Sequence, residues 1–256
     1  MASFRNHAAI LAGFAAVLSC LGSAPLSAAN DKNVSRLDTK AVEKIIRDYL
    51  LKNPKIVVDA MEAHQRNAAA QEELAVQRTI KARRKELRHD PDSVVGGNFL
   101  GDVTLVEFFD YRCGVCKRVH PIVNQLVKRD GKIRRIYKEW PILGAPSVFA
   151  ARAAIASRKQ GDDKYLEFHH SMMSAKQSLT PDIIMKLATS TGLDPARLKS
   201  DMRAPEIDKI IQRNYELAQS LKLNGTPSFL IGDTLLKGAR DADTMLNLVR
   251  EARKKS

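Results

Sequence analysis

The spacing of hydrophobic positions divides the chain into an N-terminal third with helical periodicity and a remainder in which strands and helices alternate. Between residues 39 and 51 apolar side chains recur at helical spacing, which predicts a short amphipathic helix. Asn53 and Pro54 then restart a helix, because a capping side chain followed by a proline in the first turn is typical of a helix start. Nothing interrupts this second pattern before Asp90 and Pro91, so it predicts a long helix.

The long helix carries only a thin apolar stripe, formed by Val57, Met61, Ala68 and Ala75. Such a stripe cannot support a compact domain alone, because a helix of this kind draws its stability from what it packs against. The segment therefore either packs against copies of itself as an oligomerisation stalk or remains a bare helix that moves. We favour the first alternative and expect residues 30–90 to form an N-terminal helical oligomerisation region.

After a turn expected at Gly96 and Gly97, strand-like and helical segments alternate. The pattern predicts a strand over residues 103–109, followed by Asp110, the cysteine motif and a helix to about residue 129. A second strand at 132–140, a helical run at about 145–222, two strands at 227–231 and 234–237 and a last helix at 241–254 follow. A β-α-β half, a helical insertion and a β-β-α half together make a thioredoxin fold. We therefore predict an α/β domain over residues 91–256, with a helical subdomain inserted at about 145–222.

The N-terminus has the layout of a secretory signal peptide. A basic residue precedes an apolar run over residues 8–21, and a stretch of small residues follows. We expect the signal peptide to span residues 1–29, with cleavage after Ala28 or Ala29. The apolar run is shorter than the ~20 strongly apolar residues that a membrane span needs, which predicts an exported, soluble mature protein.

Cys20, at the end of that apolar run, raises the alternative of a lipid anchor with cleavage before it. Leu18 is a poor fit to the small residue usual near such a cleavage site, so we favour loss of Cys20 with the signal peptide. Cys113 and Cys116 then remain. Two cysteines separated by two residues do not make the disulfide scaffold of a small secreted protein.

The chain is basic, with 42 Lys and Arg against 29 Asp and Glu among its 256 residues and a net charge of +13. Such a balance can indicate nucleic acid or an anionic membrane surface as a partner. Export argues against nucleic acid, and aromatic residues make up only 5% of the chain, without basic-aromatic interleaving. We therefore predict no nucleic-acid partner and interpret the basic cluster at residues 81–88 as a solvated helix face.

Cys113 and Cys116 form a Cys-Gly-Val-Cys motif between a predicted strand and a predicted helix. The first sulfur of such a motif lies at the helix N-terminus, where unpaired amide groups and the helix dipole favour its thiolate. The thiolate attacks a disulfide to form a mixed disulfide, which the second thiol resolves. We therefore predict a redox-active disulfide, with Cys113 as the nucleophile and Cys116 as the resolving thiol.

Two other uses of this motif are a metal site and an inert crosslink. His120 gives a spacing that zinc could use, but no convincing fourth ligand is visible. We interpret His169 and His170 as surface or capping residues. A crosslink over two intervening residues closes too small a loop to constrain much of the unfolded chain. We therefore expect no metal site and no cofactor.

Three motifs carry a resemblance to a known family. They are Glu107-Phe-Phe-Asp-Tyr-Arg-Cys-Gly-Val-Cys-Lys117, Glu139-Trp-Pro-Ile-Leu-Gly144 and Asn224-Gly-Thr-Pro-Ser-Phe229. In this order they resemble the DsbA-like thioredoxin family, in particular its branch related to suppressor-of-copper-sensitivity protein C (ScsC). The resemblance covers the chain from about residue 90 to its end.

This resemblance implies roles for three further residues. Thr226 and Pro227 would form a cis-proline loop that faces the cysteines and binds substrate. A cis peptide there leaves backbone groups of Thr226 free to pair with an extended substrate, and an ordinary trans-proline turn is the alternative. Glu107 would be a buried carboxylate that moves a proton to or from Cys116. The alternative for Glu107 is an exposed position on the polar side of its strand.

The chain departs from the family's strongly oxidising members between the cysteines. Gly114 and Val115 stand where DsbA has proline and histidine. Without that histidine, stabilisation of the thiolate depends on the helix terminus and on Lys117 and Arg118. We therefore expect a less depressed pKa for Cys113 and a weaker oxidant than DsbA.

The redox state in which the cysteines are kept decides between isomerase and oxidase, because a dithiol reshuffles disulfides and a disulfide donates them. The N-terminal extension favours a protein disulfide isomerase or reductase, since joined catalytic domains raise the effective concentration of active sites around one substrate. The resemblance implies a periplasmic homo-oligomer that acts on unfolded or misoxidised exported proteins and is kept reduced by a membrane thiol reductase of the DsbD or ScsB type. The alternatives are a dithiol oxidase and a copper-binding thiol protein, since soft sulfur ligands select Cu(I).

Overall fold

The structure is a computed structural model that describes residues 38–255. The predicted signal peptide over residues 1–29, with Cys20, lies outside the described residues. The chain divides into two compact units, Met1–Met61 and Glu62–Ser256. In the described part of the chain, no helix is both long and apolar enough to cross a membrane.

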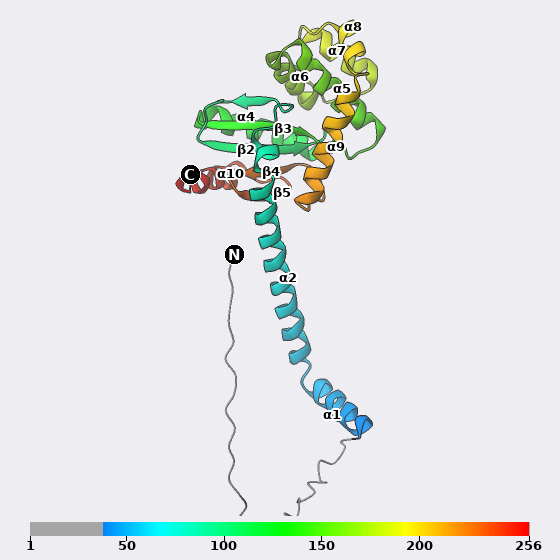
Figure 1. Cartoon of the computed structure of the whole chain (residues 1–256), viewed down its shortest axis with the longest axis vertical. Coiled ribbons are helices and arrows are strands. Elements are labelled where there is room, and N and C mark those ends of the chain that lie inside the picture. The colour runs from blue at the N-terminus through cyan, green and yellow to red at the C-terminus, as the bar shows by residue number, and fades with distance from the viewer. Residues whose placement is uncertain (1–37, 256) are drawn as a thin grey trace, which may run out of the picture. The chain divides into compact units, whose positions relative to one another are not determined.

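The described part of the first unit consists of a short helix and the start of a longer one (Figure 1). Helix α1 spans Thr39–Lys52, and the side chain of Asp38 caps it by accepting a hydrogen bond from the backbone N–H of Lys40 at 3.2 Å. It ends at Asn53, ahead of a proline, and α2 then runs over Lys55–Ala82. Both helices begin where the sequence predicts them.

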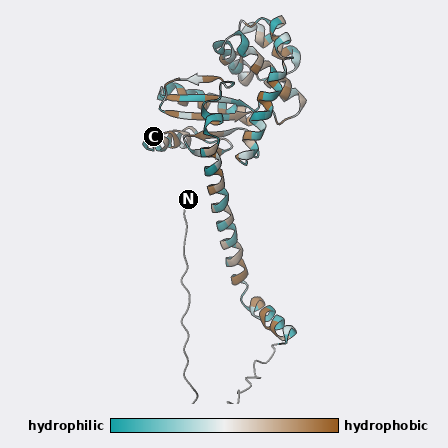
Figure 2. Ribbon diagram, in the orientation of Figure 1, coloured by the Kyte–Doolittle hydropathy of each residue, from teal (hydrophilic) through white to brown (hydrophobic). Residues whose placement is uncertain are grey.

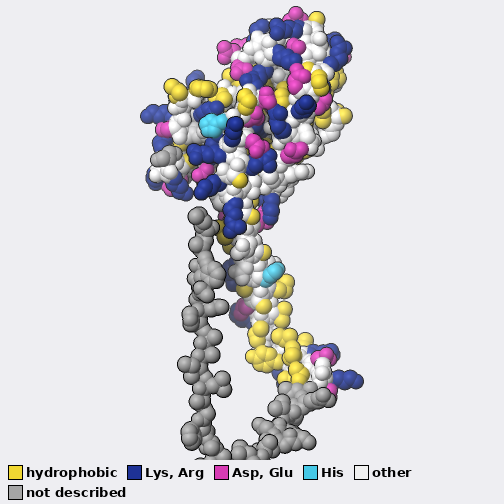
Figure 3. Space-filling view, in the orientation of Figure 1, with side chains coloured by type: hydrophobic (Ala, Val, Ile, Leu, Met, Phe, Trp, Pro, Cys, Tyr) yellow, Lys and Arg dark blue, Asp and Glu magenta, His cyan; other side chains and the backbone are white. Residues whose placement is uncertain are grey.

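This first unit exposes most of its large apolar side chains. No residue of α1 is buried. The exposed apolar residues of α1 and the first turns of α2 are Ile45, Ile46, Tyr49, Leu51, Ile56, Val57, Val58 and Met61. Figures 2 and 3 show hydrophobic residues gathered along this part of the chain. No described residue covers this surface, and an exposed apolar patch of this kind is typical of a contact with another molecule.

The second unit contains, within the described residues, a five-stranded sheet with helices around it (Figure 1). After α2 the elements are α3 (Arg84–Arg88), β1 (Val95–Gly97), β2 (Val103–Phe109), α4 (Gly114–Asp130), β3 (Ile133–Glu139), α5 (Ala145–Ser157), the 3-10 turn η1 (Arg158–Gln160), α6 (Asp162–Ser174), α7 (Pro181–Ser190), α8 (Pro195–Asp201), α9 (Pro205–Ser220), β4 (Ser228–Ile231), β5 (Thr234–Lys237) and α10 (Ala242–Lys254).

The order of strands in the sheet is β1-β3-β2-β4-β5. β2 and β3 are parallel, in register from Val103 opposite Ile133 to Phe109 opposite Glu139. β1, β4 and β5 pair antiparallel with their neighbours. A β2–α4–β3 unit, the inserted helices α5 to α9 and a β4–β5–α10 unit together make the thioredoxin fold that the sequence predicts.

Helices cover both faces of the sheet. α4 and α10 cover one face, where Leu105 of β2 packs in a cluster with Val123 and Met245. The end of α2, α3 and α9 cover the other face, to which Val106 points. Since successive side chains of a strand point to opposite faces, Glu107 lies on the same face as Leu105, toward α4.

The inserted helices have a core of their own, which continues to the cysteines. Phe168, Met172, Ile184 and Leu198 belong to one buried cluster with Cys116. The cysteine motif therefore lies where the helical insertion meets the sheet.

Strand β1 is one difference from the sequence prediction, which places only a turn at its glycines. Gly97 has a positive φ of 69°, and a Cβ atom there would lie 2.5 Å from the carbonyl oxygen of Ile133. Glycine is therefore required for this edge strand to approach β3.

The end of the N-terminal helical segment is a second difference. α2 stops at Ala82, and Val76, Ile80 and Leu87 are buried against Leu217 and other residues of the second unit. The compact unit accordingly begins at residue 62, whereas the sequence predicts a boundary at residue 90. The reason is a short apolar stretch of α2 whose partners lie more than a hundred residues away in sequence.

Candidate active site

Cys113 caps the N-terminus of α4, on the segment that leaves β2. Its sulfur accepts a hydrogen bond from the backbone N–H of Cys116 at 3.4 Å. Cys113 is 8% exposed, whereas Cys116 is fully buried, and both are free thiols. One thiol therefore lies at a helix N-terminus near the surface, and the other lies one turn inside.

The surroundings shift the pKa values of the two thiols in opposite directions. A hydrogen bond with the Cys116 thiol, a second with Thr226, and the backbone N–H groups of Cys116 and Val115 outweigh burial and lower the pKa of Cys113 to about 5. The hydrogen bond with Cys113, together with burial, raises the pKa of Cys116. At neutral pH Cys113 is therefore a thiolate and Cys116 a thiol.

Lys117, one of the two cations that follow the motif, has a hydrogen-bond partner outside the cysteine site. Lys117 donates a hydrogen bond through Nζ to the carbonyl oxygen of Ala175 at 2.7 Å, which links α4 to the end of α6. The largest effects that lower the pKa of Cys113 are hydrogen bonds.

The loop before β4 lies against Cys113. The Cys113 thiol donates a hydrogen bond to the carbonyl oxygen of Thr226 at 3.3 Å, across 113 positions of sequence. The Thr226–Pro227 peptide bond is cis, which is the conformation that the resemblance implies. The fold therefore brings the two predicted substrate-binding residues to the predicted nucleophile.

Asp110, to which the sequence analysis gives no role, holds the loop that carries Cys113. It is 1% exposed and accepts hydrogen bonds from the backbone N–H of Arg112 at 2.7 Å and the hydroxyl of Ser147 at 2.8 Å. It also accepts one from the backbone N–H of Leu143 at 3.0 Å. These bonds tie the cysteine loop to the connection between β3 and α5. A carboxylate directly after a buried strand and three residues before a cysteine is the sequence signal that could have identified it.

Glu107 is buried in β2 and pairs with a cation from β3. Its Oε2 accepts hydrogen bonds from Nε and Nη2 of Arg135 at 3.0 and 2.5 Å, and Arg135 is 2% exposed. Arg135 also donates to Oδ1 of Asn124 on α4 at 2.6 Å. The other carboxylate oxygen of Glu107, Oε1, has no hydrogen-bond partner among the described residues. The alternative of an exposed Glu107 is therefore wrong, and Arg135 offsets part of the cost of burying its charge.

A histidine cluster packs between α4 and α6. Nε2 of His120 lies 2.9 Å from Nδ1 of His170, and Nδ1 of His169 lies 2.9 Å from the hydroxyl of Tyr111. His169 is 2% exposed, so the surface or capping role expected for it is wrong. Burial, followed by the charge of Arg135, lowers the pKa of His120 to about 3 and also lowers that of His169. Over residues 38–255, no group of three or more His, Cys, Asp or Glu side chains could hold a metal ion.

The fold and the dithiol site define a thioredoxin-fold oxidoreductase, and comparison with known proteins gives its family. Residues 104–250 match the DSBA-like thioredoxin domain, and residues 38–71 match the copper resistance protein ScsC N-terminal domain. The chain belongs to the DSBA-like thioredoxin domain family. It is a thiol–disulfide oxidoreductase of the DsbA and ScsC type, as the sequence motifs predict.

Solved structures similar to the chain include a thioredoxin-like oxidoreductase from Silicibacter pomeroyi DSS-3, which is 44% identical with a TM-score of 0.65. That match covers 68% of this chain and 99% of the other. ScsC from Proteus mirabilis in a transitional conformation is 28% identical with a TM-score of 0.65, and that match covers 88% of this chain and 99% of the other. The second match thus extends into the N-terminal helices.

Among curated proteins, disulfide bond formation protein D of Bacillus subtilis (strain 168) is 24% identical over 159 residues. This match covers 58% of the chain and 72% of that protein. The chain is also 26% identical over 186 residues to Na(+)/H(+) antiporter NhaA 1 of Mycobacterium sp. (strain KMS), of which it spans only 28%.

Proposed function

We propose that the protein catalyses thiol–disulfide exchange on protein substrates, with Cys113 as the attacking thiolate and Cys116 as the resolving thiol. The Cys113 sulfur attacks one sulfur of a substrate disulfide, forms a mixed disulfide and releases the other sulfur as a thiolate. Cys116 then loses its proton and attacks the Cys113 sulfur, which frees the second substrate sulfur and leaves a Cys113–Cys116 disulfide. The substrate gains two electrons and the enzyme loses two, so a reductant must restore the dithiol.

The main support for this proposal is the difference in pKa between the two thiols. A pKa of about 5 makes Cys113 a thiolate at neutral pH, whereas the raised pKa of Cys116 preserves its proton until it attacks. A low pKa also makes Cys113 a good leaving group when a substrate thiolate attacks the mixed disulfide. Release by a substrate thiolate is the step by which an isomerase moves a disulfide to a new position.

We assign proton transfer to or from Cys116 to Glu107. The support is the carboxylate's position in the strand that leads to the cysteines, its complete burial and its free Oε1. Arg135 holds only Oε2, which leaves one oxygen available to accept a proton.

Substrate binding is assigned to Thr226 and Pro227. The half-buried Thr226 lies beside the Cys113 sulfur, where a substrate disulfide has to arrive. An extended substrate segment pairing with the Thr226 backbone would place its cystine sulfur next to the thiolate.

The activity we propose is that of a disulfide isomerase or reductase in an oligomer. The exposed apolar surface of α1 and the start of α2 supports association of N-terminal helices from several chains, as does the match to the ScsC N-terminal domain. Several active sites then surround one substrate and raise the local concentration of thiolate. In this arrangement the N-terminal helical region serves association through α1 and the first turns of α2, and residues 91–256 serve catalysis.

The proposed location is the periplasm, with the segment over residues 1–29 removed on export. A periplasmic thioredoxin-like protein from Salmonella enterica serovar Typhimurium, 30% identical to the chain, supports this location. The proposed partners are unfolded or misoxidised exported proteins and a membrane thiol reductase of the DsbD or ScsB type, which supplies the electrons that the cycle consumes.

The test is recovery of activity from wrongly paired ribonuclease by the reduced full chain. Cys113→Ser is expected to abolish the recovery, because no mixed disulfide forms. Ile45→Ser with Tyr49→Ser is expected to lower it by removing part of the exposed apolar surface, while Glu43→Ser with Arg47→Ser, on polar exposed positions of the same helix, should not. If the chain oxidises reduced ribonuclease but recovers none of the wrongly paired form, the protein is an oxidase and the isomerase assignment is wrong.

A further inference from the structure

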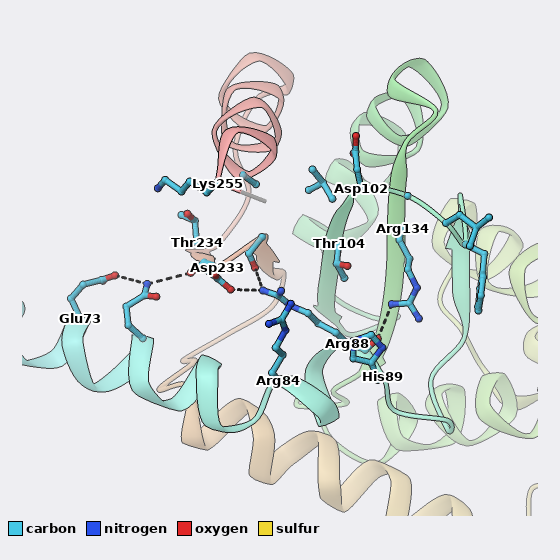
Figure 4. Close-up of a pocket in the computed structure, with 17 residues that line it drawn as sticks. Glu73, Arg84, Arg88, His89, Asp102, Thr104, Arg134, Asp233, Thr234 and Lys255 are labelled. Atoms are coloured by element: carbon cyan, nitrogen blue, oxygen red, sulfur yellow. Dashed lines mark hydrogen bonds and ion pairs between the residues drawn. The ribbon is translucent and has the colours of Figure 1, made fainter.

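Figure 4 shows a pocket of about 930 Å³. Its residues place it at the end of the sheet opposite to the cysteines. It is lined by α2, α3, the loop before β2, the first residues of β2 and β3, the β4–β5 turn and the end of α10. Val103 at the start of β2 lines the pocket, whereas Cys113 follows the end of that strand. Seven residues of extended strand separate the two ends by roughly 20 Å, so the pocket is distinct from the cysteine site.

Cations from three elements line this pocket outside any ion pair of the described residues, although the charge of Lys255 contributes to lowering the pKa of the Glu251 carboxyl. Arg84 at the start of α3, Arg134 in β3 and Lys255 after α10 form no ion pair with a described residue. Arg134 donates a hydrogen bond to the carbonyl oxygen of Arg88 at 2.7 Å, and its guanidinium carbon lies 5.5 Å from the centre of the Phe99 ring. Burial lowers the pKa of Arg134, and no carboxylate offsets this effect.

The carboxylates at the pocket do not balance these cations. Asp102 accepts hydrogen bonds from Arg253 at 2.8 to 3.0 Å, and Asp233 pairs with Arg88. Glu73 is the one lining carboxylate, among the described residues, that no cation neutralises. The pocket therefore has an excess of positive charge after its internal ion pairs are counted. Figure 4 shows Arg84 extending from α3 toward the space below the Arg88–Asp233 pair.

Hydroxyl groups and an apolar edge complete the pocket. The hydroxyls of Thr104 and Thr234 line it, and neither has a hydrogen-bond partner in the part of the chain that the structure describes. Phe99 and Leu100 are 70% and 86% exposed, although both are large apolar residues. Cations, free hydroxyls and an apolar loop thus meet in one place.

We propose that this pocket is an anion site for a phosphate-bearing group, held by Arg84 and Arg134 with the Phe99–Leu100 loop beside the apolar part of the ligand. A guanidinium matches phosphate oxygens with two parallel hydrogen bonds and stacks on an aromatic ring at the same time. Thr104 and Thr234 supply hydroxyl donors to the remaining oxygens. A soluble phosphate and the headgroup of an anionic phospholipid share this chemistry, and the apolar loop suits the second.

Part of this site lies outside both family matches. The ScsC N-terminal domain match ends at residue 71, and the DSBA-like domain match begins at residue 104. Arg84, Arg88, His89, Phe99 and Leu100 all lie in the segment between them. The joining segment therefore supplies Arg84 and the Phe99–Leu100 loop, whereas Thr104, Arg134 and Thr234 come from the DSBA-like domain.

The test measures binding of two probes to the purified full chain, inorganic pyrophosphate by calorimetry and vesicles by co-sedimentation. The vesicles are phosphatidylcholine with and without phosphatidylglycerol. Arg84 is exposed and its side chain forms no ion pair with a described residue, so Arg84→Gln is expected to preserve the fold. It should weaken binding by about tenfold, the loss of one charge-assisted hydrogen-bonded pair. Arg84→Gln with Arg134→Gln should weaken it further. The control is Arg203→Gln, which removes the same charge from an exposed position between α8 and α9.

Saturable binding of either probe that Arg84→Gln weakens and Arg203→Gln does not supports the site. Binding of pyrophosphate identifies a soluble anion, and binding of only the phosphatidylglycerol vesicles, reduced by Leu100→Ser, identifies a lipid headgroup. Equal effects of Arg84→Gln and Arg203→Gln would show that only net charge matters and would overturn the proposal, as would no binding of either probe. Thiol–disulfide exchange by each variant reports on its fold.

Discussion

Asp110 illustrates how a single buried side chain fixes a reactive loop at the residue scale. Its carboxylate has only neutral donors around it, two backbone N–H groups and the Ser147 hydroxyl. Each of these groups is positioned by the carboxylate and loses its partner if the carboxylate is removed. The loop that presents Cys113 therefore depends on a residue that does not take part in exchange.

We predict that Asp110→Ala lowers the free energy of unfolding by about 2–4 kcal/mol, because buried donors lose their acceptor. It should also slow exchange, since Cys113 is no longer held at the end of α4. Urea denaturation of the reduced full chain measures the first effect. Glu167→Ala, at an exposed position of α6, is the control and should change stability little. A stability equal to that of the control would remove Asp110 from this role.

Glu139 makes the stability of the fold depend on pH, and the sign of this dependence follows from the burial of its carboxyl group. Burial raises its pKa to about 7 despite a hydrogen bond from Tyr165, so the folded chain retains a proton that the unfolded chain has already lost. The destabilisation by this group therefore begins above the unfolded pKa of about 4.5, grows with pH and levels off above about 7.

Glu139→Gln is accordingly expected to gain stability relative to the natural chain as pH rises from 5 to 8, with little further gain above that. Denaturation curves of both proteins across this range test it, with Glu167→Gln as the exposed control. A difference between the two proteins that is constant with pH would contradict the assignment.

Among the secondary-structure elements, β2 and β3 are linked by the buried ion pair of Glu107 and Arg135. Their register places these residues on the face that α4 covers, so the ion pair has no access to water. A charge in such a position is costly when its partner is removed, but the pair as a whole need not add stability.

Arg135→Met alone should destabilise the chain by about 3–5 kcal/mol, because it leaves an unpaired buried carboxylate. The double variant Glu107→Leu with Arg135→Met should recover most of that loss. Both are measured by the midpoint of urea denaturation. Equal destabilisation in the single and double variants would mean that packing, and not the charge, sets the cost.

The elements with strong periodicity are the ones that the sequence predicts well. β2, β3 and the helices on either side of Pro54 lie where their apolar spacing places them. The sequence does not predict β1, because two consecutive glycines are typical of a turn. The reason for a glycine in this strand is its close approach to Ile133, which only the structure shows. The burial of Val76 is not predicted either, since its partners come from a distant helix.

Some residues of the candidate site can likewise be predicted from the sequence, and others cannot. Cys113, Cys116, Thr226 and Pro227 follow from motifs and lie together in the structure. The sequence near Glu107 does not indicate that Arg135 is its partner. The two residues are 28 positions apart and meet only because β2 and β3 pair in parallel. The contacts of His120 with His169 and His170 depend on how the helical insertion folds back on α4, which spacing along the chain does not encode.

At the scale of the whole molecule, the exposed apolar surface of the first unit is the feature that points to association. We predict that Ile45→Ser with Tyr49→Ser lowers the mass of the full chain in solution, as measured by sedimentation equilibrium, because it replaces two exposed apolar residues on one face of α1. Glu43→Ser with Arg47→Ser should leave the mass unchanged. A natural chain that sediments as a monomer would contradict the association of N-terminal helices.

The reactivity of Cys113 as a thiolate can be measured by the rate at which iodoacetamide alkylates the reduced full chain at a series of pH values. Peptide mapping by mass spectrometry assigns the modified cysteine at each pH. We predict alkylation of Cys113 with a midpoint near pH 5 and none of Cys116 at neutral pH. A midpoint near the ordinary thiol pKa of about 8.5, or modification of Cys116 first, would contradict it.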